Sequence, residues 1–461
     1  MKGILKPFKE VGKRLSWYGE NFAKGDIFVK LSYFIMGMSN IARKQIVKGL
    51  GYLILEISFL VFMIMFGVSN MVNLTTLGTK QQDKVFDEAS GMFVFIQGDN
   101  SMHMLLAGVV TLGVIVFFVI MWASSIKSGA YVYELKLRGK KINGIIQDVK
   151  DLFDTNIHRL LLFIPMLGLV VFTVLPLVYM ILMAFTNYDV DHQPPGNLFT
   201  WIGLENFRVL LLSGGAIAKT FWPILGWTLV WAVFATFTNY FAGMLLAMLI
   251  NMKGIKAKKL WRTIFVITIA VPSFVSLMVV RTMLNQNGII NILLQNLGFT
   301  ETALPFLTNA TWARATVIIV NMWIGIPHTM LITTGILMNI PSELYESAKI
   351  DGASPFKTFM KITLPYMWFV TTPYLISNFI ANVNNFNPIY FLTGGGPETL
   401  EYFKGAGKTD LLVTWLYKLT KDSKDYCYAS AIGIVIFIIS AVMSLIVYRR
   451  TSAYKDEEGF Q

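Results

Sequence analysis

The chain has 461 residues, of which 55% are hydrophobic and only 14% are charged. Several apolar runs reach roughly 20 residues, the length that an α-helix needs to cross a bilayer, so the composition predicts an all-α polytopic membrane protein and excludes a water-soluble one. The net charge of +12 is not a sign of nucleic-acid binding, because Lys and Arg are concentrated in loops beside the apolar runs and are not interleaved with aromatic residues for base stacking.

Cysteine and histidine usage gives no sign of a metal or redox centre. Cys427 is the single cysteine, which excludes an intramolecular disulfide and a thiolate metal site. The four histidines are scattered and match no metal-binding motif. We therefore expect this chain to bind no metal and no cofactor of its own.

The first 48 residues are basic and partly amphipathic. Their apolar run from Ile27 to Met38 is interrupted by Lys30 and is too short to cross a membrane, so we expect residues 1–48 to form a cytoplasmic or interfacial segment. The basic start lacks a following apolar core with a small-residue cleavage site, so no cleavable signal is predicted. The first true span is expected to insert the chain into the bacterial cell membrane.

About eight membrane spans are predicted after this segment. Their approximate bounds are 49–67, 104–123, 159–184, 221–250, 263–284, 312–337, 366–391 and 429–448. Lys and Arg are concentrated in 124–158 and 251–262 and absent from 285–311, so the positive-inside rule places both chain termini in the cytoplasm. The expected organisation is a basic segment (1–48), two leading spans with their loops (49–158), a six-span core (159–450) and a cytoplasmic tail (451–461).

Two places fit this layout less simply. Glu56 lies inside the first span, where an acid is a candidate functional group; near the start of the span it can instead reach water or pair with a lysine, which we favour. Segment 392–428 is predicted outside although its acids are mixed with lysines. Within it, residues 411–419 predict a short helix with one apolar face, on the outer surface or at the mouth of a pathway.

The sequence GAGKTD at 405–410 resembles the end of a phosphate-binding loop. The full pattern requires a glycine five residues before Gly407, where the chain has Tyr402. The segment follows no predicted strand and is expected on the side of the membrane without ATP. We therefore interpret it as a connecting loop.

Residues 341–365, PSELYESAKIDGASPFKTFMKITLP, are too polar to lie in hydrocarbon although they stand between two spans. Their pattern predicts two short helices and an elbow, with Ser342 capping the first helix and Gly352 ending it in the left-handed conformation. Ser354-Pro355 predicts the second cap, and Pro365 closes the unit. We expect a water-facing hairpin that contacts a partner, although an ordered loop without a partner has the same spacing.

Polar residues inside the sixth and seventh spans form a candidate ligand site. Asn378, Asn382 and Asn385 fall at i, i+4 and i+7 and share one helical face. Amides donate and accept at once, which suits a neutral, hydroxyl-rich ligand such as a sugar, but they also form helix–helix hydrogen bonds. In the sixth span, the break around Pro327 adds further candidates: Trp323, Gly325 and His328. His328 could equally be a packed, hydrogen-bonded side chain.

The 341–365 hairpin resembles the EAA loop of the membrane subunits of bacterial ABC importers. The residues that carry the resemblance or its helical spacing are Glu346, Ala348, Asp351, Gly352, Ala353, Phe356, Ile362, Leu364 and Pro365. Ser347 replaces the middle alanine of the motif, a small-for-small change. The resemblance implies that the hairpin is a coupling helix that docks on a cytoplasmic ATPase, which binds ATP-Mg in place of this chain.

The stretches NNFNPIYFLTGGGP (384–397), KTDLLVTWLYKLT (408–420) and WIGIPHTML resemble the maltose/maltodextrin (MalF-type) permease family. The resemblance implies the type I ABC importer fold and carries the family's sugar contacts onto Trp323, Gly325, His328, Asn378, Asn382 and Asn385. It also implies a second, MalG-type permease, two ABC ATPases and an extracytoplasmic sugar-binding (lipo)protein as partners. At Ala381 an aromatic contact of the family is missing, and 185–220 is too short for the extracytoplasmic domain that some members insert.

Three other hypotheses remain at this point. An ion-driven secondary transporter usually carries mid-membrane charges and inverted repeats, for which Glu56 alone is weak support. A membrane-embedded enzyme would need paired carboxylates or a metal constellation, and the sequence suggests neither. The third keeps the ABC machinery but changes the cargo to another oligosaccharide, of the raffinose or multiple-sugar type.

Overall fold

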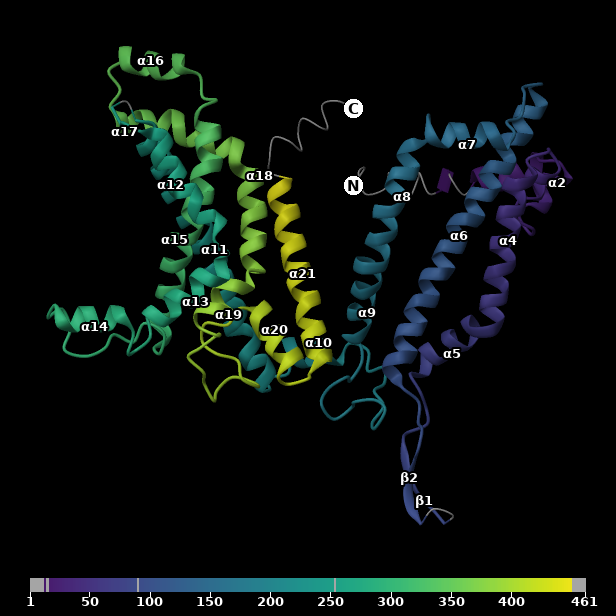
Figure 1. Cartoon of the computed structure of the whole chain (residues 1–461), viewed down its shortest axis with the longest axis horizontal. Helices are drawn as coiled ribbons and strands as arrows, with labels where there is room; N and C mark the ends of the chain where they lie inside the picture. Colours follow the sequence, from purple (N-terminus) through teal and green to yellow (C-terminus); the bar gives the residue numbers. More distant parts are fainter. Residues whose placement is uncertain (1–11, 14–15, 89–90, 253, 450–461) are drawn as a thin grey trace. The chain divides into compact units, whose positions relative to one another are not determined.

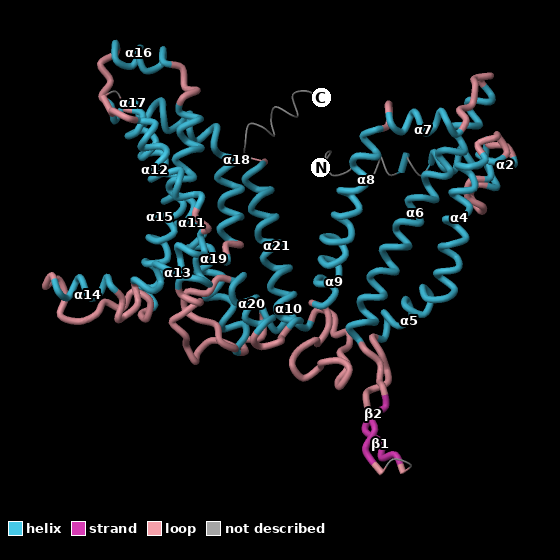
Figure 2. The backbone as a smooth tube through the Cα atoms, in the orientation of Figure 1, coloured by secondary structure: helices cyan, strands magenta, loops and turns pink. Residues whose placement is uncertain are grey.

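The computed structural model describes residues 12–13, 16–88, 91–252 and 254–449, which form two compact units that divide after Trp201. Helices dominate both units, and one short two-stranded hairpin is the sheet formed by the described residues (Figures 1 and 2). The predicted all-α class is therefore confirmed, with a small β-hairpin added.

The first unit contains three long helical stretches and the hairpin. Its elements are α2 (Ile27–Leu31), α3 (Met38–Ile41), α4 (Ile46–Phe62), the π-helical turn η1 (Met63–Gly67), α5 (Val68–Thr76), β1 (Asp83–Asp87), β2 (Met92–Ile96), α6 (Ser101–Leu137), α7 (Ile145–Phe153), α8 (Ile157–Leu169), the π-helical turn η2 (Val170–Val174) and α9 (Leu175–Met183). The stretches Ile46–Thr76, Ser101–Leu137 and Leu160–Met183 are long and apolar enough to span a membrane.

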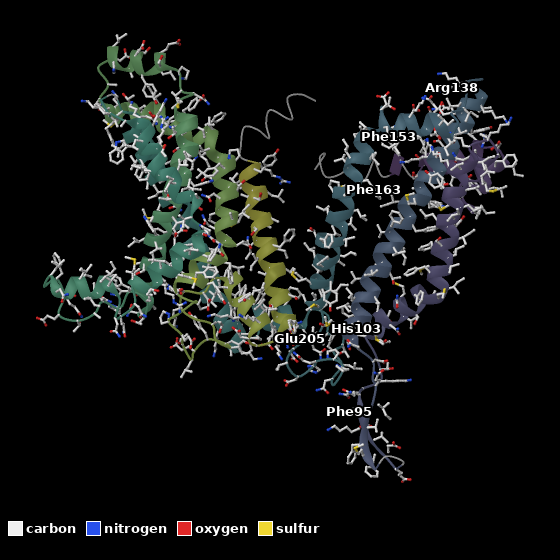
Figure 3. All side chains as sticks on the ribbon, in the orientation of Figure 1. Phe95, His103, Arg138, Phe153, Phe163 and Glu205 are labelled. Atoms are coloured by element: carbon white, nitrogen blue, oxygen red, sulfur yellow. The ribbon has the colours of Figure 1, made fainter. Side chains whose placement is uncertain are left out.

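The first two of these helices continue well beyond the predicted spans. His103 and Arg138 mark opposite ends of α6, and Phe95 lies on the hairpin that precedes it (Figure 3). Helix α6 has 37 residues, because nothing in its polar second half breaks a helix when the apolar run ends. The hairpin was not predicted; its strands pair antiparallel, with Val85 opposite Val94 and Phe86 opposite Phe93.

The N-terminal segment folds against α6 through polar contacts. The Arg43 guanidinium is buried, forms a 2.7 Å ion pair with Asp26, and lies 4.9 Å from the centre of the Tyr133 ring. The run from Ile27 to Met38 does not form a spanning helix, as predicted. Glu56, expected to reach water or to pair with a lysine, is partly exposed, and its carboxylate accepts a 2.7 Å hydrogen bond from the backbone N–H of Met36, in the turn between α2 and α3.

The second unit is built around one long, largely buried helix, α11. Its elements are α10 (Glu205–Leu211), α11 (Ala216–Asn251), α12 (Lys258–Ala270), α13 (Ser273–Met283), α14 (Ile289–Asn296), α15 (Ala310–Leu337), α16 (Ser342–Ile350), α17 (Pro355–Thr358), the π-helical turn η3 (Phe359–Thr363), α18 (Leu364–Val383), α19 (Phe386–Leu392), α20 (Leu412–Lys421) and α21 (Tyr426–Tyr448). Helix α11 packs against α12, α15, α18 and α20, and its Trp231 and Tyr240 are fully buried.

Two predicted spans are interrupted helices. The fifth, 263–284, consists of α12 and α13, which meet at an angle of 89° at Val271 and Pro272. Proline has no N–H to continue the helical hydrogen bonds, and at Pro272 the helix breaks completely. The seventh, 366–391, ends as a helix at Val383 and resumes as α19 at Phe386.

These interruptions change the apparent number of spans. Six helices of the described residues are long and apolar enough to cross a membrane, or seven if the bent pair counts as one span. The predicted span that is missing from this count is the seventh, because the asparagines and the internal Pro373 of α18 lower its hydropathy. In contrast, α15 runs through Pro327 without a break, so the predicted interruption of the sixth span is wrong.

The 341–365 hairpin forms two helices, but its ends differ from the prediction. Pro341 occupies the cap position, so Ser342 is the first helical residue instead of the cap. Gly352 has the predicted positive φ, +68°, and Ser354 caps α17 by accepting the Lys357 N–H at 3.2 Å. Pro365 does not close the unit, because α17, η3 and α18 form one continuous helical stretch in which it lies near the start of α18.

Candidate functional site

A polar cavity of about 400 Å³ lies inside the second unit, lined by α11, α12, α13, α15, α18 and α19. Six asparagines line it: Asn239, Asn321, Asn378, Asn382, Asn385 and Asn387. None of the described residues in its wall is Asp, Glu, Lys or Arg. The cavity therefore offers many uncharged donors and acceptors, which match neutral hydroxyl groups better than ions.

The cavity lies where two helices are interrupted. Val271 and Pro272, between α12 and α13, line it, as does Asn385, between α18 and α19. Non-helical backbone at membrane depth is tolerated where it borders a protected or water-filled space, and interrupted helices at substrate sites recur in transporters. Helices α13 and α19, which follow the two interruptions, pack against each other. The residues at which these two helices are interrupted thus also line the cavity.

The structure places most of the predicted ligand residues in this cavity. Gly325 and His328 line it from α15, and Asn378, Asn382 and Asn385 line it from α18 and the residues that follow. Trp323 is not part of the wall and is 59% exposed. Two residues along an α-helix turn the side chain by about 200°, so Trp323 cannot share a face with Gly325 in an unbroken helix.

Asn382 is held more tightly than a simple ligand residue would be. It is 6% exposed, and its side-chain N–H donates to the Thr236 hydroxyl of α11 at 3.0 Å. Its backbone carbonyl accepts the Trp231 indole N–H at 3.1 Å, and Asn385 donates to its Oδ1 at 3.5 Å. Both earlier interpretations of these amides therefore apply to Asn382: it joins two helices and it borders the cavity.

Three further residues in the wall were not predicted from sequence. Asn239 and Asn321 are each 6% exposed, and each has an amide atom without a hydrogen-bond partner in the described part of the chain. Tyr374 is the wall's one Phe, Tyr or Trp side chain among the described residues, and its hydroxyl lies 3.4 Å from that of Thr329. Spacing could have indicated two of them: Asn321 lies four residues before Gly325, and Tyr374 four residues before Asn378.

The loop between α19 and α20 is fastened around the buried carboxylate of Asp410. That carboxylate accepts hydrogen bonds from the Gly407 N–H at 2.7 Å and the Thr414 hydroxyl at 2.8 Å, and forms a 2.7 Å ion pair with Lys418. Burial raises the pKa of Asp410 above its ordinary value, against the opposing effect of the Lys418 ammonium. Gly407 thus donates to a carboxylate of the chain itself, and Lys408 pairs with Glu401 at 2.7 Å. The segment 405–410 therefore has the contacts of a structural connecting loop and not those of a phosphate-binding loop.

The predicted amphipathic helix in this region is α20. Leu412, Trp415 and Leu419 form its buried face, and Leu411, just before its start, is buried too. The loop also contacts α11, because the Trp227 indole donates to the Thr409 carbonyl oxygen at 3.0 Å. The helix is therefore packed within the second unit rather than lying free on a surface.

The 341–365 hairpin stands at one end of the second unit, where it joins the end of α15 to the start of α18 (Figure 1). Ala348 is buried, Ala353, Ile362 and Leu364 are partly buried, and the Tyr345 hydroxyl hydrogen-bonds that of Thr363 at 3.0 Å. The other predicted coupling residues are exposed: Glu346, Asp351, Gly352, Phe356 and Pro365. The exposed fractions of Ile350 and Phe356, 86% and 74%, are unfavourable in water unless another surface covers them.

Comparisons with known proteins support the resemblance seen in the sequence. The family model for the binding-protein-dependent transport system inner membrane component matches residues 239–452. The maltodextrin transport system permease protein MdxF of Bacillus subtilis is 33% identical over 92% of this chain and 95% of its own length. The galactooligosaccharides transport system permease protein GanP of the same organism is 32% identical over 92% of this chain and 97% of its own length.

A solved structure shares the fold. A chain of a bacterial ABC transporter involved in import of the polysaccharide alginate aligns with a TM-score of 0.51 and 23% identity, over 66% of this chain and 98% of that chain. Relatives above 30% identity cover nearly the whole sequence, and the polar cavity and the exposed hairpin are features expected of a permease. The chain therefore belongs to the maltodextrin-type permease family, the multi-pass membrane subunits of binding-protein-dependent ABC importers.

Proposed function

We propose that this permease imports maltose and maltodextrins. The observation that carries the proposal is the uncharged cavity with six asparagines, and the similarity to a maltodextrin permease over most of the chain supports it. Each amide can donate to one sugar hydroxyl and accept from another, so a wall of amides can replace the water around a sugar without charge. An ion pathway would be expected to carry charged groups or coordinating acids.

In this proposal, Tyr374 supplies the aromatic ring of the sugar site in place of the candidate Trp323. A sugar ring exposes C–H groups on its faces, and an aromatic ring can bury its own apolar surface against them. Tyr374 lines the cavity on the same helix as Asn378, whereas Trp323 is exposed and outside the wall. Ser273, at the start of α13, contributes a further hydroxyl to the wall.

We further propose that the hairpin couples the cavity to a cytoplasmic ATPase. The α17–η3–α18 stretch runs without interruption from the hairpin to Asn378 and Asn382, so a push on the hairpin can move one wall of the cavity as a rigid body. The partners would be a second, MalG-type permease, two ATPases that bind ATP-Mg, and an extracytoplasmic sugar-binding lipoprotein. The chain itself carries out no hydrolysis.

The proposed orientation places the hairpin and both chain termini in the cytoplasm. The basic segment 251–262 joins α11 to α12 near the end of the unit that carries α16, and α14 lies at the other end (Figure 1). Segment 285–311, which contains α14, has no Lys or Arg. The positive-inside rule then supports a cytoplasmic position for the hairpin.

The second candidate changes only the cargo. GanP, a galactooligosaccharide permease, is nearly as similar to this chain as MdxF is. An oligosaccharide of that kind, or of the raffinose type, also offers many hydroxyls to the same amides. The choice between cargoes depends on how the hydroxyls are arranged.

Uptake by the assembled importer in proteoliposomes tests the proposal. Radiolabelled maltotriose should accumulate only when ATP and the binding protein are present, and unlabelled maltodextrins should compete better than raffinose or galactooligosaccharides. Preferential competition by one of the other sugars would select the second candidate. Uptake that persists without ATP but stops when the ion gradient is collapsed would contradict both and favour a secondary transporter.

A further inference from the structure

Helices α11 and α15 approach each other closely along one side of the cavity. A Cβ atom added to Gly243 of α11 would lie 2.7 Å from the Cβ of Thr329, so the two helices touch almost backbone to backbone there. One turn earlier on each helix, the partners are Asn239 on α11 and Gly325 on α15. A Cβ added to Gly325 would lie 2.7 Å from Cγ of Asn239 and closer still to its Nδ2. Gly325 therefore makes room for the Asn239 side chain.

Asn239 is buried in this contact but is not satisfied by it. Its side chain lines the cavity, the residue is 6% exposed, and Oδ1 has no hydrogen-bond partner among the described residues. A buried polar atom without a hydrogen-bond partner destabilises the protein. Asn382, by comparison, has its amide N–H occupied by Thr236. The amide that α11 itself brings to the cavity thus has capacity left for a ligand.

We propose that Asn239 contacts the transported sugar and contributes to its selection. Gly325 positions the Asn239 side chain by leaving space for it. The amide would exchange a hydrogen bond with one sugar hydroxyl from the α11 side of the cavity, while Asn378 and Asn385 act from the α18 side. Gly325 then acts through Asn239 instead of contacting the sugar itself. This inference rests on the proposed import of an oligosaccharide.

The first test is a double-mutant cycle in which one change is made in the protein and the other in the sugar. Uptake of maltotriose and of its monodeoxy analogues is measured with the wild-type importer and with Asn239→Ala. Loss of one neutral hydrogen bond, about 1 kcal/mol, should raise KM for maltotriose roughly fivefold. One analogue should be taken up poorly by the wild-type importer, and Asn239→Ala should not reduce its uptake further. That analogue already lacks the hydroxyl that Asn239 would contact.

Thr238→Ala is the matched control. Thr238 precedes Asn239 on the same helix, donates to the Phe234 carbonyl oxygen of its own helix and does not line the cavity, so its loss should leave KM and the analogue profile unchanged. Asn239→Ser is a second variant for the case in which alanine prevents assembly. The serine side chain is too short to replace the amide, so this variant should show the same rise in KM and the same insensitivity to one analogue.

The second test separates the positioning role of Gly325 from the ligand contact. Gly325→Ala should lower the melting temperature and the yield of the assembled complex, because the new methyl group meets Asn239. Combining Gly325→Ala with Asn239→Ser should restore both. Equal damage in the two backgrounds would show that Gly325 does not leave space for Asn239.

The outcomes distinguish this inference from the proposed function. A wild-type importer that takes up no oligosaccharide overturns the proposed function and this inference with it. Normal wild-type uptake, with the KM and analogue profile of Asn239→Ala unchanged, overturns the sugar contact alone.

Discussion

The cavity and the 341–365 hairpin depart in opposite ways from the usual rule that apolar side chains are buried and polar side chains face water. The cavity holds polar amides at membrane depth, among them Asn239 and Asn321 with unpaired atoms. The hairpin exposes large apolar side chains, Ile350 and Phe356, outside the spans. Each arrangement is costly for the chain alone. Each is therefore best explained by something that binds there, a polar ligand in the first case and a protein surface in the second.

The difference also concerns how each region is encoded. The hairpin is one contiguous segment whose conformation depends on local rules of capping and glycine. The cavity is assembled from six helices, and its shape depends on where two of them stop. Changes in the hairpin should therefore act on coupling while binding is kept, and changes in the cavity should act on binding while coupling is kept.

Gly352→Val should have the largest effect on transport. The residue has φ of +68°, and a β-branched side chain in that conformation costs at least about 1–2 kcal/mol, which would displace α16 from its contact. We expect ATP-driven uptake to fall roughly tenfold or more while membrane insertion and sugar-dependent protection of the cavity remain. Gly335→Val, at a position in α15 with open space around it, is the control. Unchanged uptake in Gly352→Val would refute the coupling role.

Phe356→Ala should weaken the binding of the ATPase partner to the permease. A largely exposed aromatic side chain that becomes buried in an interface typically contributes about 2 kcal/mol or more, so the Kd for the ATPase should rise at least tenfold. The matched control is Phe369→Ala, which removes another exposed phenylalanine, 64% exposed, from α18. Titration of the purified ATPase into permease-containing nanodiscs measures both. Equal affinity in the two variants would place the docking surface elsewhere.

Tyr374→Ala and Trp323→Ala compare the two aromatic candidates. Loss of a ring that packs on a sugar face should raise KM for maltotriose about three- to tenfold in the Tyr374 variant. The Trp323 variant should keep its KM, because that side chain is outside the cavity wall. A larger change at Trp323 than at Tyr374 would reverse the assignment.

The contiguous region was the easier one to predict. Gly352 and Ser354 behave as their local sequence indicates, because a left-handed glycine and a serine cap are decided within a few residues. The errors at Ser342 and Pro365 arise where the chain continues into another element: Pro341 takes the cap, and the π-helical turn η3 carries the helix past Pro365.

The cavity was predictable only where its residues repeat along one helix. Asn378 and Asn382 share a face by spacing alone, and Asn385 reaches the same cavity although the helix has ended. Asn239 has no such local signal, because its role depends on how α11 meets Gly325 of α15. Trp323 lies outside the cavity wall, because α15 continues unbroken and a residue two positions before Gly325 points to another face. Which faces meet is a property of packing, and a single sequence does not contain it in a local pattern.

Asn382→Ala and Asn385→Ala should separate support from binding within the cavity. Without the Asn382 amide, the buried Thr236 hydroxyl loses its partner, so the melting temperature of the complex should fall, by an amount that corresponds to about 1–3 kcal/mol. Asn385 makes a single long contact with Asn382, so its loss should leave stability nearly unchanged and raise KM for maltotriose roughly two- to fivefold. Thermal unfolding and uptake measured on the same preparations provide both readouts. If Asn385→Ala destabilises the complex as much as Asn382→Ala does, both amides serve helix packing, and selection of the sugar must come from the remaining amides of the wall.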